Sequence, residues 1–207
     1  MINTENPFDD LKRLFSVFLG TENTIGQPYT ASIPKGLREL YGIHESYSTL
    51  KPKNTLFCNQ DRLLLPAEIK DDQYFDFLIE NQRCWKCETE RGRENPPVYI
   101  HDAESIDIVG RKMIHNSLND FLTTYALQEL AFELDFSINE HFDLEAILNS
   151  SLKTEELWMD KSYTWGDTNR YNFWLVEDSC FIMDCSIRYF ATNDPQKFDY
   201  VTKLLKK

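Results

Sequence analysis

The 207-residue sequence has no long apolar run and little glycine or proline. No stretch approaches the roughly 20 apolar residues that cross a membrane, and no basic segment followed by an apolar one opens the chain. We therefore expect neither a membrane span nor a signal peptide. Five cysteines, an odd number without secretory context, favour reduced thiols and a cytoplasmic location.

Basic residues are also scarce, with 22 against 34 acids and a net charge of −12. Direct nucleic-acid binding is disfavoured, because phosphates need a basic surface. Residues 126–160 hold nine acids and one base. This window has two interpretations: a solvated acidic helix face, or a docking surface for a basic partner. The second interpretation gives the candidate contact residues Glu140, Asp143, Glu145, Glu155 and Glu156.

The sequence lacks the common catalytic and metal-binding motifs. The sequence has no P-loop, no G-x-S-x-G and no H-E-x-x-H, and its four histidines are dispersed. Cys84 and Cys87 form a C-x-x-C, but on a strand they would point to opposite faces, and no helix follows that would lower a thiol pKa. We expect no enzyme, no metal and no cofactor. One alternative stays open, that Glu80 beside Trp85 acts as a general acid or base.

Apolar spacing predicts an α+β fold. Helices are expected from Asn6-Pro7 to Gly20, from Pro34 to Gly42, over 117–134, over 144–148 and from Pro195 onward. Strands are expected over 74–79, 83–88, 98–101, 163–165, 171–176 and 180–187, with turns at 80–82 and 177–179. Because helices and strands do not alternate regularly, we predict a single domain with a mostly antiparallel sheet flanked by helices.

Several short segments then share an order and spacing. They are 59–69 (NQDRLLLPAEI), 75–82 (FDFLIENQ), Trp85, 95–99 (NPPVY) and 117–122 (SLNDFL). Together they resemble the SUKH superfamily, which includes yeast cell-wall-assembly regulators and bacterial immunity proteins of polymorphic toxin systems. The resemblance covers about 33–134. We therefore expect one SUKH-like domain over 1–207, with 135–207 as an α/β elaboration.

The resemblance also assigns motif residues. Glu80, Asn81 and Gln82 match the family's E-N-Q turn, and Trp85 matches its hairpin tryptophan. Pro96 and Pro97 match a D-P-P-V segment, with Asn95 standing where Asp is usual. We expect all of these to be structural. The turn's side-chain oxygens would accept backbone N–H groups, and the indole would pack on the sheet.

The function that the resemblance implies is that of a non-enzymatic immunity protein. It would bind and neutralise a cognate toxin domain stoichiometrically, as a cytoplasmic monomer. The acidic balance suits a basic toxin, such as a nuclease or another toxin that acts on nucleic acid. The alternative is a regulatory protein-interaction module outside toxin systems, as in the yeast relatives.

Overall fold

The computed structural model describes residues 1–21, 32–52, 55–82, 84–101, 110–139, 142–160 and 170–205. The helices of these residues are α1 (Pro7–Leu19), α2 (Lys35–Leu50), α3 (Leu118–Glu133), α4 (Leu144–Leu148) and α5 (Pro195–Leu205), with a short 3₁₀ helix at Pro66–Glu68. The strands are β1 (Asp61–Leu63), β2 (Tyr74–Glu80), β3 (Lys86–Glu90), β4 (Val98–His101), β5 (Lys112–His115), β6 (Phe136–Asn139), β7 (Thr154–Asp160), β8 (Tyr171–Val176), β9 (Cys180–Asp184) and β10 (Arg188–Thr192).

The first sheet is an antiparallel meander in the order β1-β2-β3-β4-β5. Its apolar face packs on the helices, and Phe77 of β2 meets Phe121 of α3 edge to face, with ring centroids 5.8 Å apart. A bulge in β2 between Asp76 and Leu78 changes the alternation. Phe77 and Leu78 are therefore both buried, whereas Ile79 is only half-buried.

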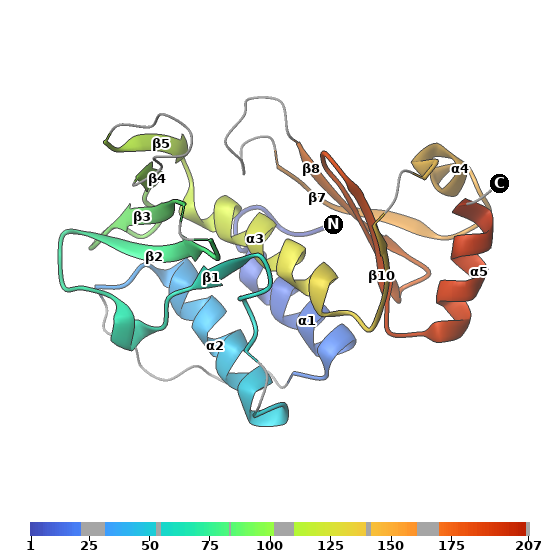
Figure 1. The fold of residues 1–207 in the computed structure, drawn as a ribbon, viewed down its shortest axis with the longest axis horizontal. Coiled ribbons are helices and arrows are strands. Elements are labelled where there is room, and N and C mark those ends of the chain that lie inside the picture. Colours follow the sequence, from blue (N-terminus) through green and yellow to red (C-terminus); the bar gives the residue numbers. More distant parts are fainter. Residues whose placement is uncertain are drawn as a thin grey trace.

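The second sheet is also antiparallel, in the order β6-β10-β9-β8-β7. Helices α1 and α3 lie against one face, where Phe18 packs edge to face on Phe181 at 6.2 Å. The other face carries α4 and α5, whose Ile147 and Val201 share an apolar cluster with Phe190 of β10. Figure 1 shows the resulting succession of sheet, helices, sheet and helices.

Helix α3 lies between the two sheets and is buried on all sides. Leu118, Phe121, Leu122, Tyr125 and Ala126, which have the spacing of one helix face, are buried. Four polar residues of the helix are buried as well: Thr123, Thr124, Gln128 and Glu129. Buried polar groups need hydrogen-bond partners, so these residues determine which loops and strands can lie beside the helix.

Helix α2 runs further than the sequence predicts. The predictions that it ends at Gly42 and that a loop begins at Tyr47 are wrong, because the helix continues to Leu50. A glycine inside a helix costs about 1 kcal/mol, which tertiary burial of the same turn offsets. Tyr41, Ile43 and Tyr47 on either side of Gly42 are almost completely buried.

The strands differ from prediction mainly at their ends. Strand β3 begins at Lys86, so Cys84 lies in the turn before it. The expected strand 180–187 is β9 alone, and β10 follows as a separate strand. The strand expected over 163–165 falls outside the described residues. The hairpin turn at 177–179 is confirmed: Val176 pairs with Cys180, and Glu177 and Asp178 between them both have positive φ.

The expected fold class, α+β with antiparallel sheets and flanking helices, is confirmed. One apolar cluster contains Leu37 of α2, Phe77 of the first sheet and Phe173 of the second sheet. The two sheets therefore share a core. Among the described residues, no helix combines the length and apolarity that a membrane crossing needs.

Candidate functional site

The E-N-Q turn is tied to its surroundings by side-chain hydrogen bonds. Glu80 accepts the backbone N–H of Cys84 through Oε2 at 3.1 Å, as expected for a turn carboxylate. Asn81 acts as a donor instead, and its amide gives hydrogen bonds to the carbonyls of Cys58 (3.2 Å) and Asn59 (3.0 Å). Gln82 is exposed. The turn therefore fastens the loop that leads into β1.

Helix α3 holds the same loop from the other side. Glu129 accepts the backbone N–H groups of Asn59 and Gln60, at 2.8 and 3.3 Å. Glu133 accepts the Asn59 amide at 2.9 Å and the Tyr47 hydroxyl at 2.7 Å. Burial raises the pKa of Glu129 to about 7, against the hydrogen bonds that lower it. Glu129 and Glu133 belong to the acidic window 126–160, for which the sequence suggests an exposed surface. In the structure their side chains hold the loop before β1.

Between this loop, the turn and α3 lies a cavity of about 180 Å³. Its lining consists of Gln60, Asp61, Glu80, Trp85, Cys87, Ile100, Ile114, Phe121, Gln128 and Tyr171. Gln60 is exposed, and Glu80 and Trp85 are half-buried, so these residues form the mouth. Asp61 and Gln128, 3% and 2% exposed, lie at the floor. Trp85 packs against the core, as predicted, and also borders this cavity.

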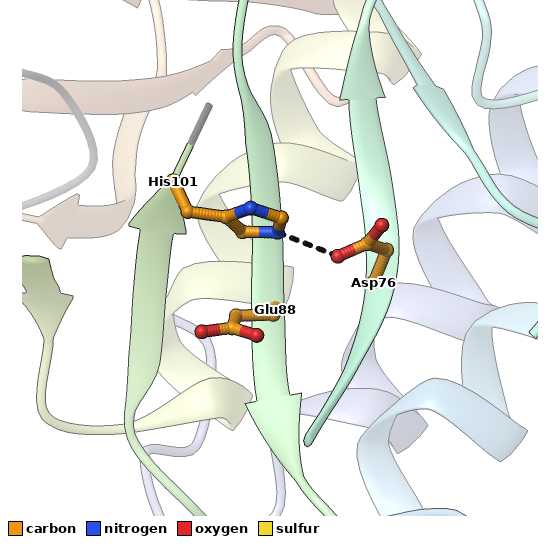
Figure 2. A group of neighbouring side chains, drawn as sticks. All are labelled: Asp76, Glu88 and His101. Carbon is orange, nitrogen blue, oxygen red and sulfur yellow. Dashed lines mark hydrogen bonds and ion pairs between the residues drawn. The ribbon is translucent and has the colours of Figure 1, made fainter. Parts of the chain in front are cut away.

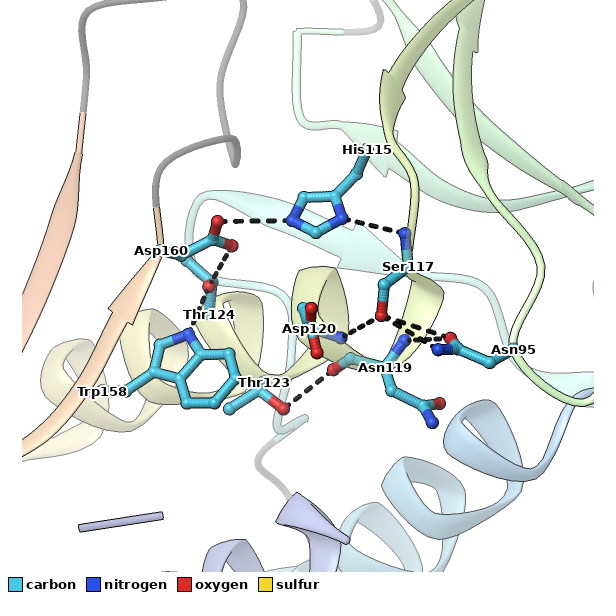
Figure 3. A network of polar contacts seen from close by, with 9 residues as sticks. All are labelled: Asn95, His115, Ser117, Asn119, Asp120, Thr123, Thr124, Trp158 and Asp160. Atoms are coloured by element: carbon cyan, nitrogen blue, oxygen red, sulfur yellow. Dashed lines mark hydrogen bonds and ion pairs between the residues drawn. The ribbon is translucent and has the colours of Figure 1, made fainter. Parts of the chain in front are cut away.

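The segment Asn95-Pro96-Pro97 closes the N-terminus of α3. Asn95 Oδ1 accepts the N–H of Asn119 at 2.9 Å, and its amide donates to the Ser117 hydroxyl at 3.0 Å (Figure 3). The carbonyl of Pro96 accepts the N–H of Leu118, and that of Pro97 accepts the Thr89 hydroxyl. Ser117 also caps the helix by accepting the N–H of Asp120, as the sequence predicts. The side chain of Asn95 supplies both an acceptor and a donor here, which an aspartate could not.

A second polar network joins α3 to the second sheet. The hydroxyl of Thr124 donates to Asp160 Oδ2 at 2.6 Å and accepts from the Trp158 indole at 2.9 Å (Figure 3). His115 Nε2 contacts Asp160 Oδ1 at 3.3 Å, while its Nδ1 accepts the N–H of Ser117 at 3.1 Å. Both ring nitrogens are thus engaged in structural bonds. A histidine, an aspartate and a serine meet, but the ring has no nitrogen left to act as a base for the hydroxyl.

On the outer face of the first sheet, three metal-ligand types converge. Asp76, Glu88 and His101 come from β2, β3 and β4, and their ligand atoms lie within 4.8 Å of one another (Figure 2). His101 Nε2 already contacts Asp76 Oδ1 at 2.6 Å. Arg111 forms an ion pair with Glu88 and lies over the Tyr74 ring, 3.9 Å from its centroid. Arg111 therefore already pairs with one of the three groups that a divalent cation would use.

Four of the five cysteines have thiols whose pKa is raised by burial. All five are free thiols. Cys87 is completely buried on β3, and burial raises its pKa well above the usual range. Burial also raises the pKa of Cys58, Cys180 and Cys185. Since the thiolate is the reactive form, these four thiols are poor nucleophiles.

The predicted partner-contact acids are divided between two elements. Asp143 and Glu145 are exposed on α4, where Asp143 caps the helix by accepting the N–H of Ala146. Glu156 is exposed on β7, and Glu155 of the same strand forms an ion pair with the Met1 amine. Glu140 lies outside the described residues. Of the other acids in the window, Glu129 and Asp160 are buried.

Comparison with known proteins adds no relative: no protein-family model, no curated protein and no solved structure matches this chain.

Proposed function

We propose that this chain is an immunity protein that binds a cognate toxin domain stoichiometrically and blocks it, without catalysis of its own. In this proposal it acts as a cytoplasmic monomer. The support is the SUKH-like set of segments together with an excess of exposed acids that suits a basic partner.

One structural observation carries most weight. The segments that resemble the family are far apart in sequence, yet specific side-chain bonds join them into one unit. Asn81 binds the carbonyls of the 58–59 loop, and Asn95 binds the first turn of α3. The bonds of Asn81 use a side chain that the resemblance selects, whereas those of Asn95 use the side chain by which this chain departs from the family pattern.

The direct test is to look for a modular toxin gene directly beside this one and to co-express this chain with the toxin domain that such a gene encodes. We expect growth to be rescued and a 1:1 complex to elute in size-exclusion chromatography with light scattering. A standard interface of about 1,600 Å² would accompany such a complex. Growth arrest with no complex would contradict the proposal. Capture of host signalling or envelope proteins instead would support the regulatory module.

The contact surface is tested by charge neutralisation. The triple variant Asp143→Asn, Glu145→Gln, Glu156→Gln should lower the association rate with the toxin about tenfold at low salt, because exposed charges mainly steer encounter. Asparagine at 143 keeps the cap of α4. The matched control Glu5→Gln, Asp72→Asn, Glu94→Gln removes the same charge from other exposed positions. Equal rates for the two triples would contradict this assignment.

A further inference from the structure

The cavity beneath the E-N-Q turn is lined by hydrogen-bond acceptors and aromatic rings. Its polar lining consists of two carboxyl residues, Asp61 and Glu80, two amide residues, Gln60 and Gln128, and the hydroxyl of Tyr171. No lysine, arginine or histidine of the described residues lines it. We propose that this cavity receives one guanidinium group, presented by an arginine side chain of the partner protein. The identification of a partner protein as the source of the arginine rests on the proposed function. The preference of the cavity for a cation is independent of that function.

The two carboxyl residues lie opposite each other on neighbouring strands. Asp61 of β1 and Glu80 of β2 are direct cross-strand partners in the antiparallel register, and both border the cavity. Like charges directly opposite each other destabilise a sheet pair. A cation between them would turn this repulsion into two favourable contacts. The planar guanidinium is suited to this, because its donors bind carboxylates along two directions.

The floor supplies an independent observation. Gln128 is 2% exposed, and its Nε2 donates to Gln60 Oε1 at 2.9 Å. Its Oε1 is buried and has no hydrogen-bond partner among the described residues. A buried acceptor without a donor is costly, and few occur in folded proteins. An N–H group entering this cavity would supply that donor.

The size and walls of the cavity restrict the occupant. Pockets for whole small molecules usually measure about 300–1,000 Å³. The volume here, 180 Å³, fits one side-chain end group. Trp85 and Phe121 give the walls aromatic and apolar surface, which accepts an alkyl stem and the face of a guanidinium. A partner arginine therefore fits both the shape and the charge.

The test uses small probes on the full chain, independently of any toxin. Propylguanidinium is compared with propylurea, its neutral counterpart, by following the Trp85 indole and Gln128 amide signals in NMR titrations. We expect the cation to bind with a dissociation constant on the order of millimolar, and propylurea not to bind. Asp61→Asn and Glu80→Gln should each weaken binding by about tenfold or more, whereas the exposed Glu94→Gln should not change it.

Two variants protect the test against misfolding, since Glu80→Gln remains usable if Asp61→Asn does not fold. Equal binding of the urea and the guanidinium, or binding unchanged in both variants, would overturn the inference. Equal binding of propylammonium and propylguanidinium would overturn the assignment of arginine as the occupant.

The toxin complex separates the two proposals. If the probe binds but no toxin does, the cation site stands and the immunity role fails. If the toxin binds with unchanged affinity to Glu80→Gln and the probe does not bind, the immunity role stands and the cavity has no part in it. If the immunity role and the arginine site are both correct, Glu80→Gln should weaken the affinity for the toxin by about tenfold.

Discussion

The hydroxyl of Thr124 joins α3 to the second sheet through two hydrogen bonds. It donates to Asp160 and accepts from the indole of Trp158, and both partners are at least nine-tenths buried. Neither partner can turn to water if the hydroxyl is removed. The network therefore contributes to stability mainly through the cost of removing one hydrogen-bond partner from each of two buried groups.

Thr124→Val keeps the shape of the side chain and removes only its polar atom. We expect a loss of about 2–4 kcal/mol in the free energy of unfolding, measured by urea titration, because two buried groups lose a partner. The neighbouring Thr123→Val is the matched control. Thr123 is equally buried but bonds only to the carbonyl of Asn119 within the helix, so it should cost less than about 1 kcal/mol. Equal losses in the two variants would contradict this role.

Glu129 makes stability depend on pH. Its pKa is raised from 4.5 to about 7 in the folded state, chiefly by burial. The stabilisation associated with the protonated form is therefore complete below pH 4.5 and is lost as pH rises through about 7. This difference in pKa corresponds to about 3 kcal/mol when the whole range is crossed.

Glu129→Gln imitates the protonated carboxyl and removes the titration. Its stability relative to the native chain should increase between pH 5 and 8, by up to about 3 kcal/mol, as measured in urea titrations at each pH. Glu94→Gln, at an exposed position, should follow the native curve throughout. A constant difference between Glu129→Gln and the native chain at every pH would show that Glu129 does not titrate in this range.

At the scale of elements, α2 lies close to two neighbouring helices at Gly36. A β-carbon placed there would lie 2.6 Å from Asn119 Oδ1 and 2.9 Å from Phe8 Cζ. These atoms belong to α3 and α1, so Gly36 marks the point where the three helices meet. The absence of a side chain allows this approach.

Gly36→Ala should therefore destabilise the protein, although alanine is the better helix former. Overpacking costs about 1–3 kcal/mol, and the propensity gain of up to about 1 kcal/mol offsets only part of it. We expect a lower melting temperature in calorimetry. A higher melting temperature would mean that the helices are not in close contact at this point.

The helices could be predicted from the sequence better than the strands. Asn6-Pro7 and Ser117 mark helix starts through local chemistry, and α1 and α3 begin within a residue of the prediction. Strand β7 was not predicted, because a bulge between Glu156 and Trp158 breaks its alternation and it contains three acids. Strand β1 has only three residues, too few for a periodic signal.

The site was less accessible to prediction than the fold. The E-N-Q turn was identified from the resemblance, and the structural role of Glu80 follows from its position in a turn. The pairing of Asp61 with Glu80, in contrast, depends on strand register, which spacing along the sequence does not fix. Glu129 was counted among surface acids, because only the packing of both sheets on α3 buries it.

At the scale of the whole molecule, the core does not stop at the limits of the resemblance. The segment 33–134 contains the first sheet, α2 and α3, but α1 and the second sheet complete the surroundings of α3. Phe18, Trp158 and Phe181 belong to the same apolar cluster as Phe121. The segment that resembles the family therefore shares its core with the remainder of the chain.

A fragment consisting of residues 33–134 should consequently fail to fold on its own. We expect no cooperative urea transition and poor dispersion of its amide NMR signals, because one side of α3 would be exposed to water. The full chain should unfold in one transition. A fragment of residues 1–134 is the control that restores α1 alone. A cooperative transition of 33–134 would show that this segment is an independent domain.

The placement of α1 also has a consequence for synthesis. Its apolar side contacts α3, and Ile2 just before it donates its N–H to the carbonyl of Leu157 at 2.9 Å. At about 5–20 residues per second, a ribosome needs on the order of ten seconds to proceed from α1 to the end of α3. During that time α1 can pack on α2, but the surface that α3 contributes to its burial is still missing. The nascent chain therefore presents a partly uncovered apolar helix to chaperones before its own fold can enclose it.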